Sequence, residues 1–93
     1  MPDHKHKDAF KRMRQNTKRR ARNRTYRSRM RTEIKKLREA ISAGDSTAAQ
    51  AQLPKTVSMI QRVAQKGIIH RKQASRRVSR LYKAIERTRA AAA

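Results

Sequence analysis

The chain has 93 residues, of which 27 are Lys or Arg and only six are Asp or Glu, so its formal net charge is +21. Cys is absent, which excludes disulfide bonds, thiolate chemistry and Cys-based zinc sites. Hydrophobic residues make up 35 % of the chain, enough for one domain with a thin core whose stability alone is marginal.

Residues 1–7 show no periodicity and are predicted to be a mobile basic N-terminus, ahead of a single three-helix domain over residues 8–93. The first helix is predicted over residues 8–42. On a helical wheel, residues 11–31 form no apolar face. A helix that is polar on all sides cannot be held in place by a hydrophobic core of its own. This basic half should extend beyond the bundle, because apolar residues at spacings of 4, 4, 3 and 4 occur only in the second half: Tyr26, Met30, Ile34, Leu37 and Ile41.

The first helix should end at Gly44, which suits the left-handed conformation after a helix, and Asp45 or Ser46 should cap the next helix. The second helix is predicted over residues 46–66. Pro54 lies inside it, so we expect a kink between about Gln50 and Pro54 or a loosely packed first turn. The predicted core stripe of this helix is Ala49, Leu53, Val57, Ile60 and Ala64.

Gly67 should end the second helix, and the third helix is predicted over residues 70–88, with the alanine tail of residues 90–93 either continuing this helix or fraying. Strand signals are missing, because no alternating apolar run and no hairpin turn occurs. Three amphipathic helices with short connections predict an all-α fold, an antiparallel three-helix bundle with a long first helix. The core stripe of the third helix is Ala74, Val78, Leu81 and Ile85.

Positive charge is concentrated toward both ends of the chain. The net charge is +11 over residues 1–31, +2 over residues 32–63 and +8 over residues 64–93. The first and third helices should therefore face a polyanion, and the second helix should face elsewhere. Nucleic acid is the obvious polyanion, since it supplies both the charge and the contacts that a polar helix lacks.

Arg predominates in the basic stretches, and its planar guanidinium can hold a phosphate with two hydrogen bonds or stack on an exposed base. Gln and Asn among the arginines can reach sugar hydroxyls or base edges, or are ordinary solvated surface. A second basic cluster surrounds the start of the third helix, where free backbone N–H groups favour an anion; the alternative is a charged solvent face. The predicted RNA-binding residues are Lys5, Lys7, Lys11, Arg12, Arg14, Gln15, Lys18, Arg19, Arg20, Arg22, Asn23, Arg24, Arg27, Arg29, Arg31, Lys35, Lys66, His70, Arg71, Lys72, Arg76, Arg77 and Arg80.

RNA is favoured over DNA as the polyanion. The sequence has no helix-turn-helix signature and no leucine-zipper register. A basic rod contacted on all sides suits a folded RNA that surrounds it, whereas a duplex groove offers one face. The alternative that stays open is a sequence-tolerant, histone-like DNA-compacting protein. A stacking platform of the kind used by single-strand binders is not available, because the aromatic residues are only Phe10, Tyr26 and Tyr82.

No metal, cofactor or catalytic site is predicted. His4 and His6 lie near Asp3 and Asp8, but a mobile cationic segment makes a poor closed metal site. Catalysis needs a positioned pair of groups in a pocket, and the acidic residues have structural explanations such as helix capping and pairing one turn apart. We expect His70 to cap a helix or to hydrogen-bond a phosphate rather than to act as an acid or base.

A membrane partner is not predicted either. No apolar run approaches the ~20 residues that span a bilayer, and no signal-peptide apolar region follows the start. The most basic part of the chain also lacks the apolar face with which an amphipathic helix enters a lipid surface. We therefore expect a soluble, internal protein.

Two motifs and the basic opening resemble a known family. The first motif, RMRTEIKKLREAISAGD, matches at Arg31, Thr32, Ile34, Lys35, Lys36, Ala40, Ile41, Ala43, Gly44 and Asp45. The second, AQKGIIHRKQASRRVSRL, matches at Lys66, Gly67, Ile69, His70, Arg71, Ala74, Arg76, Ser79, Arg80 and Leu81. The opening matches at Lys11, Arg12, Arg14, Gln15, Arg22 and Asn23. In these positions the chain is similar to the family of the bacterial small-subunit ribosomal protein S20.

This resemblance implies a three-helix bundle with an extended first helix. It implies a non-enzymatic constituent of the small ribosomal subunit, in the cytoplasm, that binds small-subunit ribosomal RNA directly and stabilises its packed helices during assembly. The implied place is near the bottom of the body and the long penultimate RNA helix. The expected partners are this RNA and, only peripherally, other small-subunit proteins; the protein should be a monomer within the ribosome, with no small-molecule substrate.

Overall fold

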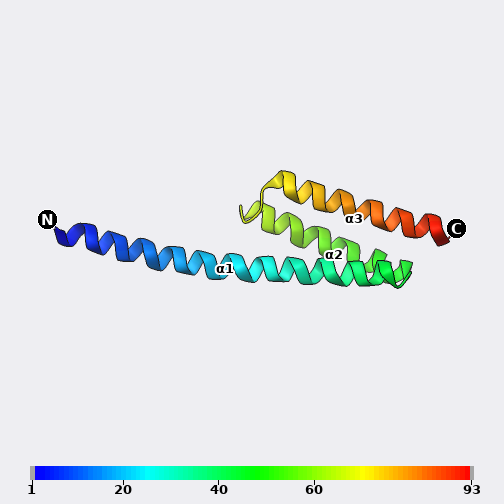
Figure 1. Ribbon diagram of the computed structural model, residues 1–93, viewed down its shortest axis with the longest axis horizontal. Helices are drawn as coiled ribbons and strands as arrows, with labels where there is room; N and C mark the ends of the chain where they lie inside the picture. The colour runs from blue at the N-terminus through cyan, green and yellow to red at the C-terminus, as the bar shows by residue number, and fades with distance from the viewer. Residues whose placement is uncertain (1, 93) are drawn as a thin grey trace.

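The structure is a computed structural model that describes the backbone of residues 2–92 and the side chains of residues 8–90. Three helices follow one another: α1 spans Pro2–Ser42, α2 spans Ser46–Gln65 and α3 spans Arg71–Ala92. No strand occurs between residues 2 and 92. Figure 1 shows that α2 runs back along α1 and that α3 runs back along α2. The predicted all-α antiparallel three-helix bundle is confirmed.

Two helix ends lie well beyond their predicted bounds. α1 begins at Pro2 rather than near Asp8, and a proline suits the first turn of a helix because its missing N–H would be unpaired there. α3 continues past Thr88 to Ala92, which is the first of the two alternatives given for the alanine tail, because alanine is the strongest helix former. The mobility predicted for residues 1–7 stays a prediction, since the side chains of this segment lie outside the described part of the chain.

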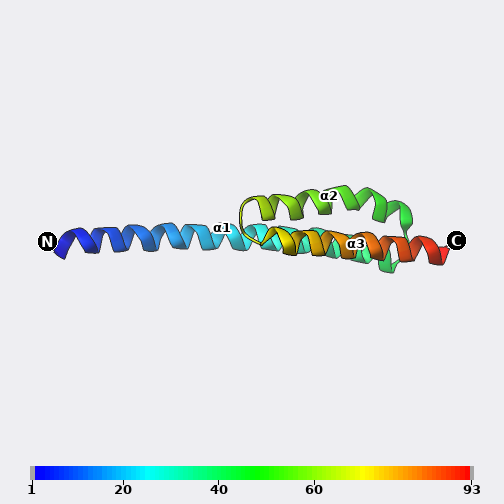
Figure 2. The ribbon, with the colours of Figure 1, turned by 90° about the horizontal axis from the view of Figure 1, so that it is seen from above.

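The molecule is a rod, with principal extents of 73 × 20 × 15 Å. α1 has 41 residues, a length of ~60 Å at the usual helical rise. α2 and α3 have only 20 and 22 residues. Two perpendicular views show the N-terminal half of α1 extending beyond both of them (Figures 1 and 2). We call residues 8–22 of this extension the overhang.

The core lies entirely in the other half of the molecule. No described residue before Met30 is fully buried. α2 packs against both other helices, whereas α1 and α3 touch each other least. The buried hydrophobic residues form one cluster: Met30, Leu37, Ala49, Met59, Ile60, Val63, Ile68, Ala74, Leu81 and Ile85.

The predicted core face of α2 is wrong in phase. Ala49 and Ile60 are buried as expected, but Leu53, Val57 and Ala64 are only half-buried. Because α2 contacts two helices, its buried face is wider than a single stripe and is rotated from the predicted one. The residues buried in addition are Thr56, Met59 and Val63.

Pro54 does not end α2, which runs unbroken from Ser46 to Gln65. The predicted loose first turn is not found, because Ala49 in that turn is 2 % exposed. The axis of α2 is gently curved in Figure 2. Pro54 itself is exposed, so its ring adds nothing to the core.

The two connections end their preceding helices in the same way. Gly44 and Gly67 have φ values of +70° and +76°, as predicted for glycines that follow a helix. The N–H groups of Asp45 and Ile68 then donate back to carbonyls of the last helical turn, at 3.0 and 3.1 Å. Asp45 also caps α2, because its carboxylate accepts from the N–H of Ala48 at 3.0 Å.

Candidate nucleic-acid interface

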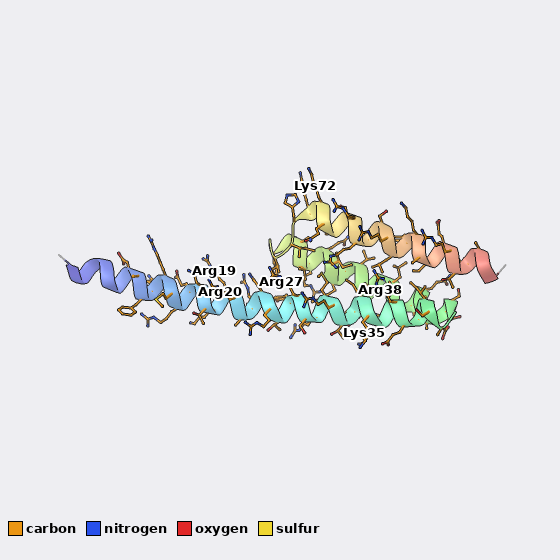
Figure 3. The ribbon with its side chains drawn as sticks, viewed as in Figure 1. Arg19, Arg20, Arg27, Lys35, Arg38 and Lys72 are labelled. Carbon is orange, nitrogen blue, oxygen red and sulfur yellow. The ribbon has the colours of Figure 1, made fainter. Side chains whose placement is uncertain are left out.

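The overhang is a helix exposed on all sides. Every residue from Asp8 to Arg22 is exposed, and between Lys11 and Arg22 the sequence places seven Lys or Arg. Among the described side chains the one ion pair is Lys36 with Glu33, 3.6 Å apart in the bundle. Within the described part of the chain, the cations of the overhang therefore form no ion pair. Figure 3 shows side chains leaving this part of α1 on opposite sides, with Arg19 and Arg20 labelled.

The overhang meets the bundle at a joint, which we define as Tyr26, Arg27, Lys66 and Ile68. The ammonium of Lys66 lies 4.9 Å from the centroid of the Tyr26 ring, within the range of a cation–π contact. The guanidinium of Arg27 donates to the carbonyl of Ile68 at 3.4 Å. Two of the predicted RNA-binding residues, Arg27 and Lys66, thus also hold α1 to the connection between α2 and α3.

Asn23 lies one turn before the joint and is half-buried. Its side-chain Oδ1 is shielded from solvent and has no hydrogen-bond partner within the described chain. Among the predicted RNA-binding residues from Lys11 to Arg24, whose side chains the structure describes, Asn23 is the one that is not fully exposed.

The start of α3 is capped by His70. Its Nδ1 accepts from the N–H of Lys72 at 3.1 Å, so structural capping, one of the two roles predicted for His70, is confirmed. A neutral imidazole that accepts at Nδ1 carries its proton on Nε2. His70 is exposed, as are Arg71 and Lys72, and Lys72 points away from the bundle in Figure 3. This end of α3 therefore presents three donors to solvent.

A groove between α1 and α3 brings three predicted RNA-binding residues of α3 together with an arginine of α1. Its cavity of about 170 Å³ has Arg76, Arg77 and Arg80 of α3 on one side and Arg38 of α1 on the other. We call these four residues the arginine groove. Sequence reasoning missed Arg38, because it lies in the stretch of low net charge; its position one turn after Ile34 is the signal that places it beside the core.

Neither a metal site nor a membrane span is found among the described residues. No group of three or more His, Cys, Asp or Glu is placed to hold a metal ion there. Within the same part of the chain, no helix combines the length and apolar character that crossing a bilayer needs. His4 and His6 lie among the residues whose side chains the structure does not describe.

The amino-acid sequence of the chain matches a known protein family. A sequence model of the family described as ribosomal protein S20 matches residues 4–86. The chain belongs to the ribosomal protein S20 family. The family predicted from the two motifs is thereby confirmed, and the S20 match includes the overhang, both connections and most of α3.

Individual members of the S20 family align with this chain over nearly their whole length. The chain is 49 % identical to the small ribosomal subunit protein bS20 of Trichlorobacter lovleyi over 80 residues, which are 86 % of this chain and 92 % of the relative. Identity to bS20 of Anaeromyxobacter dehalogenans is 49 % over 85 residues, covering 91 % and 92 %. Identity to bS20 of Magnetococcus marinus is 48 % over 88 residues, covering 95 % and 96 %.

Proposed function

We propose that this chain is a structural, non-enzymatic constituent of the small ribosomal subunit, in the cytoplasm, where it binds small-subunit ribosomal RNA directly. The observation that carries this proposal is the overhang. Its seven cations between Lys11 and Arg22 are all exposed and have no described carboxylate as partner. Packed RNA helices supply phosphates on every side of an inserted rod, so the protein stabilises their packing during assembly.

The proposed mechanism is neutralisation of phosphates combined with shape fit. Guanidinium groups around the overhang hold phosphate oxygens with paired hydrogen bonds and fix the rod between RNA segments. The start of α3 adds a second contact, in which Arg71 and Lys72 bring charge and His70 offers its Nε2–H to a phosphate oxygen. No covalent chemistry is involved.

We propose that a single copy of the chain acts, with only peripheral contacts to other small-subunit proteins. Among the described side chains, the large hydrophobic residues that are exposed are few: Phe10, Met13 and Tyr82. Tyr82 lies on α3, far along the chain from the other two, which lie among the basic residues of the overhang. A stable protein–protein interface buries ~800 Å² on each partner, and these side chains supply no patch of that size.

The histone-like alternative finds no support in the relatives, which are named as ribosomal proteins at 48 to 49 % identity. Binding experiments separate the two functions directly. The affinity for folded small-subunit ribosomal RNA is measured in a salt series, with duplex DNA in excess as competitor. We expect the RNA complex to survive the competitor at physiological salt, since only a folded RNA encloses the rod.

A matched pair of variants assigns the contacts in the same experiment. Arg19→Ala on the overhang should weaken RNA binding modestly and lower the slope of log K against log salt by about one, because one phosphate contact is lost. Lys55→Ala on α2 removes the same charge from the helix that faces elsewhere, and should leave the slope unchanged. Equal competition by duplex DNA, or equal slopes for both variants, would refute the proposal.

A further inference from the structure

The arginine groove has an unusual charge balance for a preformed cavity. Arg38, Arg76, Arg77 and Arg80 line it with no acidic residue among them. An adjoining cavity of about 420 Å³ shares Arg38 and Arg80 and adds two further cations of α3, Lys83 and Arg87. None of these residues forms an ion pair among the described side chains.

The groove lies where the bundle is weakest. α1 and α3 make the least contact of any helix pair, and the groove residues come from both of them. In Figure 3, Arg38 rises from α1 toward α3. Like charges that face one another across a gap repel, so Arg38 of α1 and the three arginines of α3 oppose closer packing of the two helices.

Arg77 is the least exposed of the four residues of the arginine groove. Its side chain is half-buried, and its Nε is shielded from solvent without a hydrogen-bond partner in the described chain. A buried N–H of a charged group that lacks an acceptor is costly, so an acceptor is expected at this place when the protein is in its working state. The other residues that line the groove are Ile34, Leu81 and Gln73, and none of them accepts a hydrogen bond from this Nε in the described chain.

We propose that the arginine groove binds a phosphate group that bridges α1 and α3 and thereby stabilises the bundle. The anion accepts from guanidinium groups on both helices and replaces their repulsion with two-sided attraction. Phosphate reaches the groove either as part of an RNA backbone or as a free inorganic anion. The RNA source rests on the function proposed above, whereas the anion site itself does not.

Inorganic pyrophosphate tests the site without any RNA. Thermal unfolding of the full chain is followed by far-UV circular dichroism, in sodium chloride and in sodium pyrophosphate at equal ionic strength. At about ten times its dissociation constant, pyrophosphate should raise the melting temperature by ~5–10 °C, as expected for a ligand that binds only the folded state of a small domain.

Two double variants with equal charge loss locate the effect. Arg38→Gln with Arg80→Gln, both exposed residues of the groove, should lose most of the pyrophosphate shift. This variant should remain folded in chloride, because the repulsion across the groove is reduced. Arg12→Gln with Arg19→Gln, on the overhang, should keep the full shift. Equal shifts in the two variants, or no shift in the unmodified chain, would overturn the proposal.

Ribosomal RNA identifies the source of the phosphate. If the RNA backbone occupies the groove, the groove variant should also lose about two units of salt slope in RNA binding. If its RNA affinity and slope are unchanged while the pyrophosphate shift is lost, the groove is a site for free anions and the RNA source is refuted. Failure of the RNA competition experiment leaves the pyrophosphate result untouched, so the two proposals fail separately.

Discussion

Thr56 joins α2 to α1 through its side chain although it is polar and has an exposed fraction of 0 %. Its hydroxyl lies 3.1 Å from the carbonyl oxygen of Glu33 in α1 and 3.1 Å from that of Gln52 in its own helix. The Gln52 amide in turn donates to the Glu33 carboxylate. We call these three residues the polar clip, since they connect the two helices by hydrogen bonds within an apolar core.

Replacing Thr56→Val should lower the free energy of unfolding by about 1 kcal/mol. The valine keeps the shape of the side chain, so no cavity forms, and the loss is that of one buried hydrogen-bonding group. Urea unfolding followed by circular dichroism measures the change.

Thr25→Val is the matched control for this substitution. Thr25 is exposed, and its hydroxyl donates to the carbonyl of Ala21 at 3.0 Å, the same local bond that Thr56 makes with Gln52. It has no bond to another helix among those in the described chain. A change within about 0.5 kcal/mol is expected; an effect as large as that of Thr56→Val would show that the polar clip adds nothing between helices.

The sequence predicted the roles of residues whose type favours a particular backbone conformation or cap position. It did not predict the roles of residues that depend on contacts between helices. Gly44, Gly67 and Asp45 could be placed from the sequence because a positive φ and an N-cap each favour few residue types. Thr56 was missed because hydrophobic periodicity passes over a polar core residue. Arg38 was missed because the net charge of a sequence segment does not show which neighbouring helix an individual side chain will face.

The two halves of α1 differ in what stabilises them. The C-terminal half buries Met30 and Leu37 and is held by tertiary packing. The overhang has no packed face, and an isolated helix of its length is marginal in water even for strong helix formers. Its neighbouring arginines and lysines also repel one another. The helix of the overhang should therefore gain stability when phosphates bind it.

The end of α1 gives a test at the level of the helix. Gly44→Ala places a side chain at a φ of +70°, with no atom within 4 Å of the new Cβ. The cost should therefore be conformational strain alone, about 1–2 kcal/mol of unfolding free energy. The melting temperature should fall accordingly, while the salt slope of RNA binding stays the same, since no cation is changed.

Gly44→Asn distinguishes strain from a steric or packing effect. Asparagine tolerates the left-handed conformation better than alanine, so its melting temperature should lie between those of the alanine variant and the unmodified chain. Identical losses for both substitutions would contradict the assignment of Gly44 to a strained turn position.

At this level the sequence predicted α1 and α3 better than α2. The stripe of α3 contains three buried residues, Ala74, Leu81 and Ile85, and one half-buried residue, Val78. Each outer helix faces mainly one neighbour, so one stripe describes its packing. α2 touches both neighbours, and a single stripe cannot represent a face of that width.

At the scale of the whole molecule, the helix at the centre of the bundle carries little charge, and the two helices beside it carry most of the cations. α2 carries only Lys55 and Arg62 as charged residues and holds the centre of the bundle. α1, α3 and the connection that precedes α3 carry the cations of the overhang, the joint and the arginine groove. The net charge of +21 opposes compaction of the free chain. A polyanion relieves this repulsion, so folding of the extremities and RNA binding should be coupled.

Hydrogen exchange of the backbone amides, read by mass spectrometry of proteolytic fragments, tests this coupling most directly. The free protein is compared with its complex on folded small-subunit ribosomal RNA. Amides of the overhang should exchange far faster than those around Leu37 and Ile60 in the free protein, and should become protected in the complex. Overhang amides that are as protected without RNA as with it, or that stay unprotected in the complex, would contradict the account that RNA encloses and orders this rod.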